Sequence, residues 1–526
     1  MKKAIIPILL LILSLVIPTF GPPAYLVALW PAICALTIIV LTKSAAFGLA
    51  TGVVSGALII HYQQPIAVPR AILAEFVFPA LNGSWHVGAI VFTLILGAFA
   101  GILEKSGGFD TVLKRLVAKA KNPKKRLLGS VYLIGLLCFF DGLANSLLTG
   151  RIARPLADRT GVSRERLAWV VDSTSSPVAC VAFISTWIAT QLSLIEQGLA
   201  EANFSVEPYS LFFQSIPGNP YCLLTLLLVP LAIGLNYQPA AMRRYQAYEV
   251  GEISESAEAG TSPHRALIPL FALLLGIFMA FPILSDPMTN PLSVEGWKTA
   301  FSGDAGPYAL VAGSVFGLVV AWVMYPKNRS VTVEKAAFQG ATNLLPALII
   351  LILAWSLGNV FSELGAGDQL AQLLSSGFSV QWLPLAVFTS GALMALATGS
   401  SWGTMGLLMP LALPATLAAA ASTGVSQADL LSLIPAVIGA VFGGAVLGDH
   451  CSPFSDTTIV SSLASGCEPT SHVHSQLPFA GIAAGFAAIA YVVIAFGVHA
   501  GLATLISGIA MVGLVYLLSK TSRSTT

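Results

Sequence analysis

The sequence predicts an all-α polytopic membrane protein of about 12 transmembrane helices. Of its 526 residues, 56% are hydrophobic and only 10% are charged, whereas soluble domains carry roughly 25% charged residues. The apolar residues also fall in runs of about 17–25, the length that a helix needs to cross a bilayer. A soluble fold and a basic nucleic-acid-binding domain are therefore excluded.

The first apolar runs predict three helices, over about 4–20, 24–41 and 45–61, followed by a polar outer segment at 62–86. The first run resembles a signal peptide, but no A-x-A cleavage site follows it. We interpret it as a retained helix with Lys2 and Lys3 inside, because Lys and Arg concentrate on the cytoplasmic side. Residues 1–86 form an N-terminal domain in this interpretation.

A first half is predicted over residues 87–236. Its first helix, at about 87–103, precedes the most basic loop, and a second basic loop covers 151–166. Both loops are expected inside, so the apolar stretch 127–150 between them cannot cross the membrane once. It is predicted to be a re-entrant hairpin with its tip near Asp141, which requires cover by protein or a wet cavity.

The remaining elements follow in order. A helix over about 167–190, an acidic outer segment at 191–220 and a helix over about 221–236 complete the first half. A flexible cytoplasmic linker is predicted at 237–266. Connecting helices follow within 267–342, at about 267–283 and 308–325, with 284–307 outside. The chain then continues with a second half at 343–498 and a C-terminal helix with its tail at 499–526. The second half contains helices at about 343–361 and 478–498, a hairpin within 382–418 that enters from outside, and a helix at 431–464 broken at 449–453.

The two halves share an inverted repeat. The segment 104–110 resembles 362–368, Arg154-Pro155-Leu156 matches Met409-Pro410-Leu411, and the break Asp172 to Pro177 matches the break Asp449 to Pro453. The first copy starts inside and the second outside. Inverted repeats with paired broken helices mark the substrate sites of many transporters.

The chain is organised around the polar stretch 448–478, which follows the apolar run Leu431–Leu447. An aspartate at the centre of a membrane helix costs ~2.5–3.5 kcal/mol on insertion scales, so these polar groups must face protein. Pro453 breaks the helix and frees a carbonyl group. Carboxylate, hydroxyl and carbonyl oxygens suit a hard cation such as Na⁺. A kinked helix whose polar groups satisfy one another is the alternative.

Asp449 and Asp456 are the first choices as Na⁺ ligands. The other candidates for cation or substrate binding lie in the two breaks or at the two hairpin tips: Asp172, Ser173, Ser452, Ser455, Thr457, Asp141, Asn145, Ser400 and Ser401. Each of them has an alternative role as a helix cap or hydroxyl partner. His450 is interpreted as a packing residue or a tuner of protonation. His472 and His474 are interpreted as part of a solvated inner loop, with pH sensing as the alternative.

The segment from Gly448 to Thr458 (GDHCSPFSDTT) resembles the signature of the NhaC family of sodium/proton antiporters. Asp141 to Arg151 and Asp172 to Pro177 resemble the motifs of that family's first half. The resemblance covers roughly 90–190 and 340–480. It implies membership of the ion transporter superfamily, with inverted repeats, two re-entrant hairpins and elevator-type Na⁺/H⁺ exchange. Asp141-Gly142 departs from the two consecutive acidic residues expected there, which puts coupling stoichiometry and substrate in doubt.

No nucleophile–base constellation and no phosphate-binding loop is present, and the six cysteines show no metal or disulfide spacing. An enzyme is therefore not expected, no cofactor is implied, and transport must run on gradients. The expected partners are Na⁺, H⁺ and membrane lipid in a bacterial-type cytoplasmic membrane with both termini inside. A carrier of a small organic acid or amino acid is the alternative, which the lack of a mid-span Arg disfavours. The sequence leaves the oligomeric state open, a homodimer included.

Overall fold

The computed structural model of the chain describes residues 2–42, 44–117, 121–202, 204, 206–245, 262–285, 305–375, 379–424, 427–453 and 455–524, with residues 290, 292–293, 296–297 and 300 between them. Every regular element in these ranges is helical. Ten of the described helices are long and apolar enough to cross a membrane, or 12 when each of two bent helix pairs counts as one span. The predicted all-α membrane fold is confirmed.

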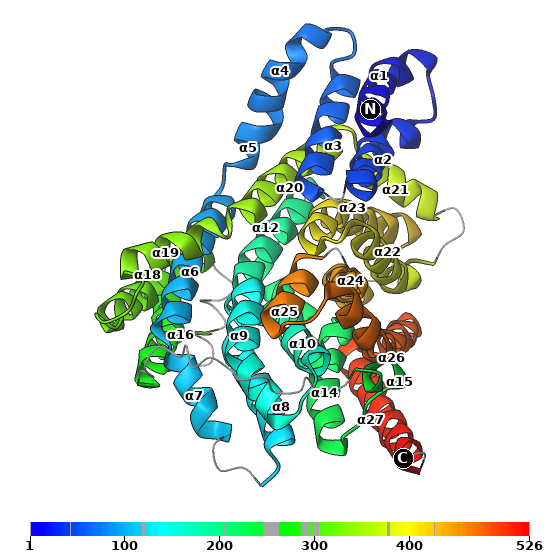
Figure 1. Cartoon of the computed structure of the whole chain (residues 1–526). Coiled ribbons are helices and arrows are strands. Elements are labelled where there is room, and N and C mark those ends of the chain that lie inside the picture. Colours follow the sequence, from blue (N-terminus) through cyan, green and yellow to red (C-terminus); the bar gives the residue numbers. More distant parts are fainter. Residues whose placement is uncertain are drawn as a thin grey trace.

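The N-terminal helices are α1 (Lys2–Val16), α2 (Ala24–Thr42) and α3 (Ala45–Ile60). The polar segment after them is helical as well: a 3-10 turn at Pro65–Ala67, α4 (Val68–Ala71), a π-helix at Ile72–Val77 and α5 (Phe78–Ala80) follow one another at the top of Figure 1. Its apolar side chains explain this, because Val68, Ala71 and Phe76 are buried while Arg70 and Glu75 remain exposed.

The first half contains α6 (Ser84–Ser106), α7 (Gly108–Val117), α8 (Pro123–Leu137), α9 (Gly142–Thr160), α10 (Arg164–Ser173), α11 (Ser176–Val181), α12 (Thr186–Glu201), α13 (Pro208–Ser215) and α14 (Pro220–Leu235). Helix α8 packs against α9. A side chain added at Gly161, just after α9, would approach Lys124 Nζ to 3.2 Å, and Lys124 lies in the first turn of α8. The segment 123–161 thus starts and ends at the same place, as a hairpin requires.

The expected end of the next helix at residue 190 is wrong. The chain leaves the helix at 182–185 and bends by 43° before it continues as α12 to Glu201. Ser185 explains the new start, because its hydroxyl accepts a hydrogen bond from the Ile188 N–H at 3.0 Å. The polar side chains beyond 190 stay inside because they find partners there: Gln197 Nε2 donates to the Trp355 carbonyl at 2.8 Å.

The middle of the chain contains α15 (Ala240–Arg243), α16 (His264–Leu284), α18 (Gly306–Met324) and α19 (Val333–Thr342). Glycine allows α16 and α18 to pack closely: a Cβ atom at Gly313 would stand 2.3 Å from the Ile277 backbone nitrogen. Of the predicted linker at 237–266, residues 246–261 lie outside the described residues, as does much of the predicted outer segment at 284–307.

The second half contains α20 (Leu345–Glu363), α21 (Ala366–Ser375), a 3-10 turn at Val380–Trp382, α22 (Leu383–Thr398), α23 (Ser401–Thr423), α24 (Gln427–Cys451), α25 (Asp456–Ser465) and α26 (Pro469–Ala495), and α27 (Ala500–Ser524) ends the chain. The predicted break near 449–453 lies at 452–455. The next helix was expected from 478 but begins at Pro469, which changes the environment of His472.

The order of the elements repeats between the halves. Helices α6 and α7 meet at Gly107 with a φ of 72°, and α20 and α21 meet at Gly365 with a φ of 61°; glycine adopts this left-handed conformation without strain. Asp141 caps α9 as Ser400 caps α23, through side-chain bonds to the backbone N–H groups of Ala144 (2.7 Å) and Gly403 (3.1 Å). In addition, α9 packs against α25 and α23 against α12, so each half packs on the other in the same way.

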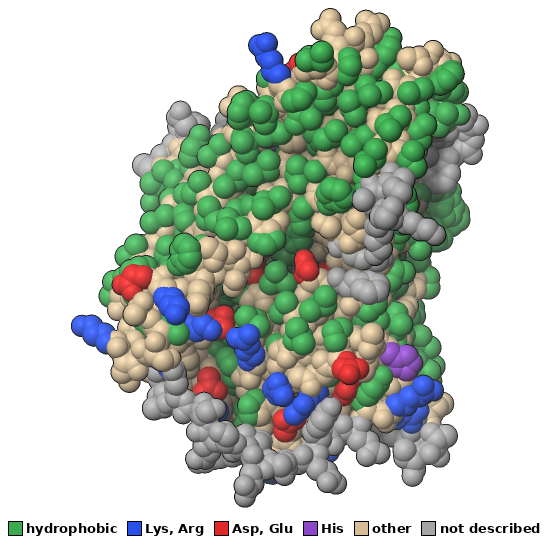
Figure 2. All heavy atoms as spheres, turned by 45° about the horizontal axis from the view of Figure 1, so that its top comes forward, with side chains coloured by type: hydrophobic (Ala, Val, Ile, Leu, Met, Phe, Trp, Pro, Cys, Tyr) green, Lys and Arg blue, Asp and Glu red, His purple; other side chains and the backbone are tan. Residues whose placement is uncertain are grey.

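The surface matches a membrane environment. The face drawn in Figure 2 is mostly hydrophobic, and the coloured charged side chains gather toward its lower end. Many exposed apolar side chains belong to helices that are long enough to span, among them Phe271, Val323 and Ile509 at 65%, 77% and 66% exposure. Apolar side chains exposed on spanning helices are suited to contact with lipid.

Candidate functional site

Asp449 lies near the end of α24 and is 1% exposed. Its Oδ1 atom accepts a hydrogen bond from Ser455 Oγ, and its Oδ2 atom accepts one from Thr457 Oγ1 at 2.9 Å. The hydroxyl of Ser176, from the start of α11, lies 3.4 Å from the same Oδ2 atom. Three hydroxyl groups from two broken helices thus surround one buried carboxylate.

The backbone at the second break follows from Pro453. Because proline has no N–H group, the carbonyl of Asp449, four residues earlier, loses its helical donor. Thr458 Oγ1 donates to this carbonyl at 3.1 Å, and the Ser452 N–H donates at 3.2 Å. The carbonyl that was predicted to be freed therefore has partners, and the turn that carries Ser455 is closed by them.

Asp172, on α10 of the first half, is fully buried beside the same region. Its Oδ2 atom accepts a hydrogen bond from Gln476 Nε2 at 2.7 Å and lies 3.3 Å from His472 Nε2. Gln476 also donates to the carbonyl of His450 at 3.0 Å. One amide from α26 therefore joins the break of the first half to the residue that follows Asp449.

Histidines 450 and 472 are both buried. His450 Nδ1 forms a hydrogen bond of 2.9 Å with the hydroxyl of Tyr221. The prediction that His472 belongs to a solvated loop is wrong: it lies on α26, in contact with Asp172 and with Ser461 Oγ at 3.3 Å. His474, two residues further along, is exposed as predicted.

The tip of the first hairpin lies against the first break. Asp141 Oδ2 accepts a hydrogen bond from Thr186 Oγ1 at 2.8 Å, in addition to capping α9. Asn145 Nδ2 donates to the carbonyls of Gly135 and Thr174, both at 2.8 Å. These contacts tie α8, α9 and the break after α10 into one unit.

The remaining predicted site residues take several different positions. Asp456 is exposed in the first turn of α25. Ser400 caps α23, and Ser401 is buried in the same helix. Ser452 meets Asp449 through its backbone N–H, and Ser173 lines a small cavity beside His450.

Sequence reasoning missed Ser176, His472, Gln476 and Tyr221. A signal existed for two of them: His472 and Gln476 are four residues apart, so they share one face of a helix, but the helix was predicted to start later. Ser176 lies inside the predicted break, where nothing in the sequence distinguishes it from its serine neighbours. Tyr221 lies at the start of an ordinary apolar run and gave no signal.

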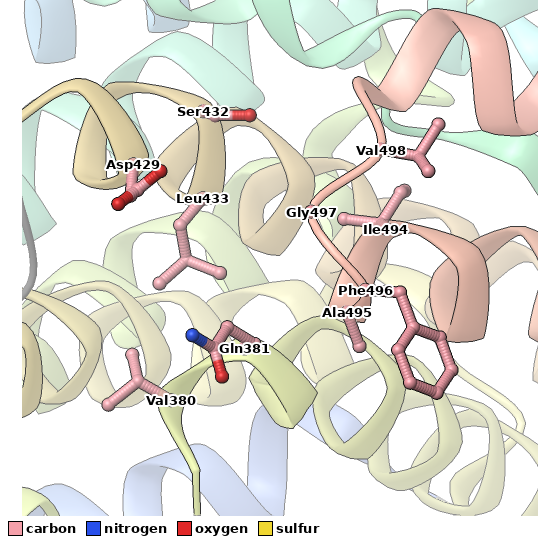
Figure 3. A pocket seen from close by; sticks show the side chains of 10 residues that line it. All are labelled: Val380, Gln381, Asp429, Ser432, Leu433, Ile494, Ala495, Phe496, Gly497 and Val498. Carbon is pink, nitrogen blue, oxygen red and sulfur yellow. The ribbon is translucent and has the colours of Figure 1, made fainter.

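An open pocket lies at the other end of α24 (Figure 3). Asp429, Gln381 and Phe496 are among its lining residues. Asp429 precedes Asp449 by 20 residues, which is roughly 30 Å along a helix that rises 1.5 Å per residue. This pocket is therefore separate from the Asp449 site. Within the described residues, no Lys or Arg forms an ion pair with Asp449 or Asp172.

A bundle of membrane-spanning helices in which two broken helices enclose buried carboxylates and hydroxyls defines a secondary transporter. The chain belongs to the Na⁺/H⁺ antiporter family, whose model matches residues 178–496, more than half of the sequence. The resemblance to sodium/proton antiporters is thereby confirmed at the level of the family.

Two relatives and one solved structure are similar to the chain. An uncharacterized protein of Haemophilus influenzae is 28% identical over 489 residues, which cover 90% of this chain and 91% of that protein. The malate-2H⁺/Na⁺-lactate antiporter of Bacillus subtilis is 31% identical over 166 residues, 31% of this chain and 32% of its own. The YdaH transporter of Alcanivorax borkumensis has a similar fold, with a TM-score of 0.55 at 16% identity over 91% of this chain and 100% of its own.

Proposed function

We propose that the protein exchanges Na⁺ for H⁺ and that Asp449 is the residue at which the two ions compete. The observation that carries this proposal is a buried carboxylate surrounded by three hydroxyl groups, with no Lys or Arg paired to it among the described residues. A buried carboxylate without a positive partner needs either a proton or a cation to offset its charge. Hydroxyl and carboxylate oxygens provide the hard ligands that a small cation prefers.

Competition at this carboxylate is sufficient for exchange. Na⁺ requires the ionised form of Asp449, whereas protonation removes the charge that attracts Na⁺. The hydroxyls of Ser455 and Thr457 donate to the carboxylate when no cation is bound. Each hydroxyl also has two lone pairs, so the same groups can turn those lone pairs toward a bound cation. One site cannot satisfy both ions at once, and alternation of that site between the two membrane faces then couples their movement.

The proposed orientation follows the basic loops. Residues 114–126 and 151–166 would face the cytoplasm of a bacterial-type cell, together with both termini. The closeness of Lys124 to Gly161 supports this, because it brings the two basic loops to the same end of the hairpin. The site that contains Asp449 and Asp172 would then be accessible alternately from this face and from the opposite face of the membrane.

The experiment is a flux assay in proteoliposomes that contain the purified protein. An imposed sodium gradient should move protons in the opposite direction without any organic solute, and protein-free liposomes provide the control. Simple ion exchange would be contradicted if sodium-driven proton flux is absent without an organic solute and appears only when a dicarboxylate, a hydroxy acid or an amino acid is added.

The second candidate function is cation-coupled transport of an organic acid. It is favoured by the likeness to an antiporter of malate and lactate over 166 residues. The buried His450 and His472 would be the counter-charges for a carboxylate substrate, since their rings lie beside the two breaks. The same assay with a panel of small acids distinguishes the two functions.

A further inference from the structure

We propose that Ser176 is a ligand of the transported cation and that it sets the preference for Na⁺ over Li⁺. This inference rests on the proposed function, because it assumes that a cation binds at Asp449. Ser176 is fully buried, and it belongs to the first half of the chain whereas Asp449, Ser455 and Thr457 belong to the second. Ser176 is thus a side chain from the break of the first half that lies beside the Asp449 carboxylate at the break of the second half.

The distance between the two side chains points to a shared cation. Ser176 Oγ lies 3.4 Å from Asp449 Oδ2, whereas Thr457 Oγ1 lies 2.9 Å from the same atom. Hydrogen bonds between a hydroxyl and an oxygen acceptor usually measure about 2.5–3.0 Å, so the contact with Ser176 is long for a hydrogen bond. Oxygen ligands stand about 2.3–2.6 Å from Ca²⁺, an ion of nearly the size of Na⁺, and two such ligands at a right angle are about 3.3–3.7 Å apart.

The local backbone holds Ser176 in this place. Ser176 opens α11, directly before Pro177, so it lies where α10 has ended and the chain turns. The hydroxyl of its neighbour Ser175 is bound to the carbonyl of Asp172 at 3.0 Å. Ser175 therefore closes the turn within the first half, whereas Ser176 contacts the Asp449 carboxylate of the second half.

Selectivity follows from the number of ligands. Na⁺ is larger than Li⁺ and needs more oxygen atoms around it. A site built from the Asp449 carboxylate, Ser455, Thr457 and Ser176 loses one of its side-chain oxygens when Ser176 becomes alanine. The smaller ion tolerates this loss better, so the variant should shift toward Li⁺.

The test compares three variants in the proteoliposome assay, with Na⁺ and Li⁺ measured separately. Ser176→Ala should raise the KM for Na⁺ by ~10-fold or more, in the range typical of losing a group that supports metal binding. The KM for Li⁺ should rise less, and the maximal rate should change little. Ser176→Thr keeps the hydroxyl, so its Na⁺ affinity should stay close to that of the wild type. Ser175→Ala is the matched control, since it removes an adjacent buried hydroxyl that donates to the carbonyl of Asp172.

The outcomes are distinct. An unchanged KM for Na⁺ in Ser176→Ala, or equal losses in Ser175→Ala and Ser176→Ala, would overturn the inference. If the wild-type protein shows no sodium-driven flux at all, the proposed function itself fails instead. Should Ser176→Ala not accumulate in the membrane, Ser176→Cys replaces the oxygen with a soft sulfur at similar volume, and a selective loss of Na⁺ affinity is again expected.

Discussion

Asp172 and His472 lie 300 residues apart in the sequence, and their side chains meet in the interior with Asp172 Oδ2 3.3 Å from His472 Nε2. Both side chains are fully buried. The contact joins α10 of the first half to α26 at the end of the second. This contact can therefore form only when both halves of the chain are folded together, and its loss can be used to test that packing.

Loss of this contact should destabilise the protein. Replacing His472 with Gln removes a partner of a buried carboxylate, which costs about 1–3 kcal/mol when the remaining group is poorly satisfied. Thermal unfolding of the detergent-solubilised protein should show a lower Tm. His474→Gln, an exposed residue on the same helix, is the control and should leave the Tm unchanged. Equal Tm values for both variants would argue against the contact.

The two aspartates of the second break should differ in effect. Asp449→Asn keeps the size of the side chain but cannot ionise, so sodium-driven proton flux should be abolished while the protein remains folded. Asp456→Asn should retain most of the flux because the structure places this side chain at the surface of α25. The reverse pattern in the flux assay would move the ion site to Asp456.

Sodium affinity should depend on pH in a defined direction. Protons and Na⁺ compete for Asp449 in the proposed mechanism, so the KM for Na⁺ should rise as the pH falls. Below the pKa of the site, the rise should approach about tenfold per pH unit, since each unit changes the fraction of the ionised form tenfold. A KM that stays constant over the pH range in which flux changes would require separate sites for the two ions.

Asn145 should be important for stability rather than for chemistry. Asn145→Ala leaves the carbonyls of Gly135 and Thr174 without the donor that now serves them at 2.8 Å each. Leaving a buried acceptor unsatisfied costs about 1–3 kcal/mol. We expect a clear drop in Tm and in the amount of protein in the membrane. Thr342→Ala, which removes an exposed hydroxyl bound within its own helix, is the comparison.

Topology can be checked with cysteine labelling. Single cysteines at positions 124 and 159 should react with an impermeant reagent from the same side of the membrane, because the ends of the α8–α9 hairpin lie together. Of the six native cysteines, five are buried and Cys451 is partly buried, so background labelling should be low. Reaction from opposite sides would exclude the hairpin.

The sequence predicted most of the helices and singled out both of the buried aspartates, Asp449 and Asp172, that the structure places at the two breaks. Apolar runs and basic loops predict the positions of membrane-spanning helices well. The reason is that a segment in lipid must satisfy its own backbone hydrogen bonds, which leaves few structures other than a helix. The boundaries at residues 190 and 478 were wrong because polar residues there were assumed to face water. Gln197 and His472 instead find partners inside the protein, and only the three-dimensional arrangement shows those partners.

The site was predictable only in part. Asp449 stood out because a carboxylate in an apolar run needs an explanation. Its partner Ser176 could not be found, since residues 273 positions apart carry no mark of their contact. The exposure of Asp456 was equally hidden, because it depends on the direction in which α25 leaves the break.

The packing of α9 against α25 has a consequence for how the protein is made. Residues 142–160 emerge from the ribosome some 300 residues before residues 456–465. Until the second segment is synthesised, the face of α9 that carries Gly150 lacks the helix that packs closely on it, with Ala464 as the nearest residue. The contacts inside the hairpin can form early, whereas its packing on the opposite half can form only after residues 456–465 have been made.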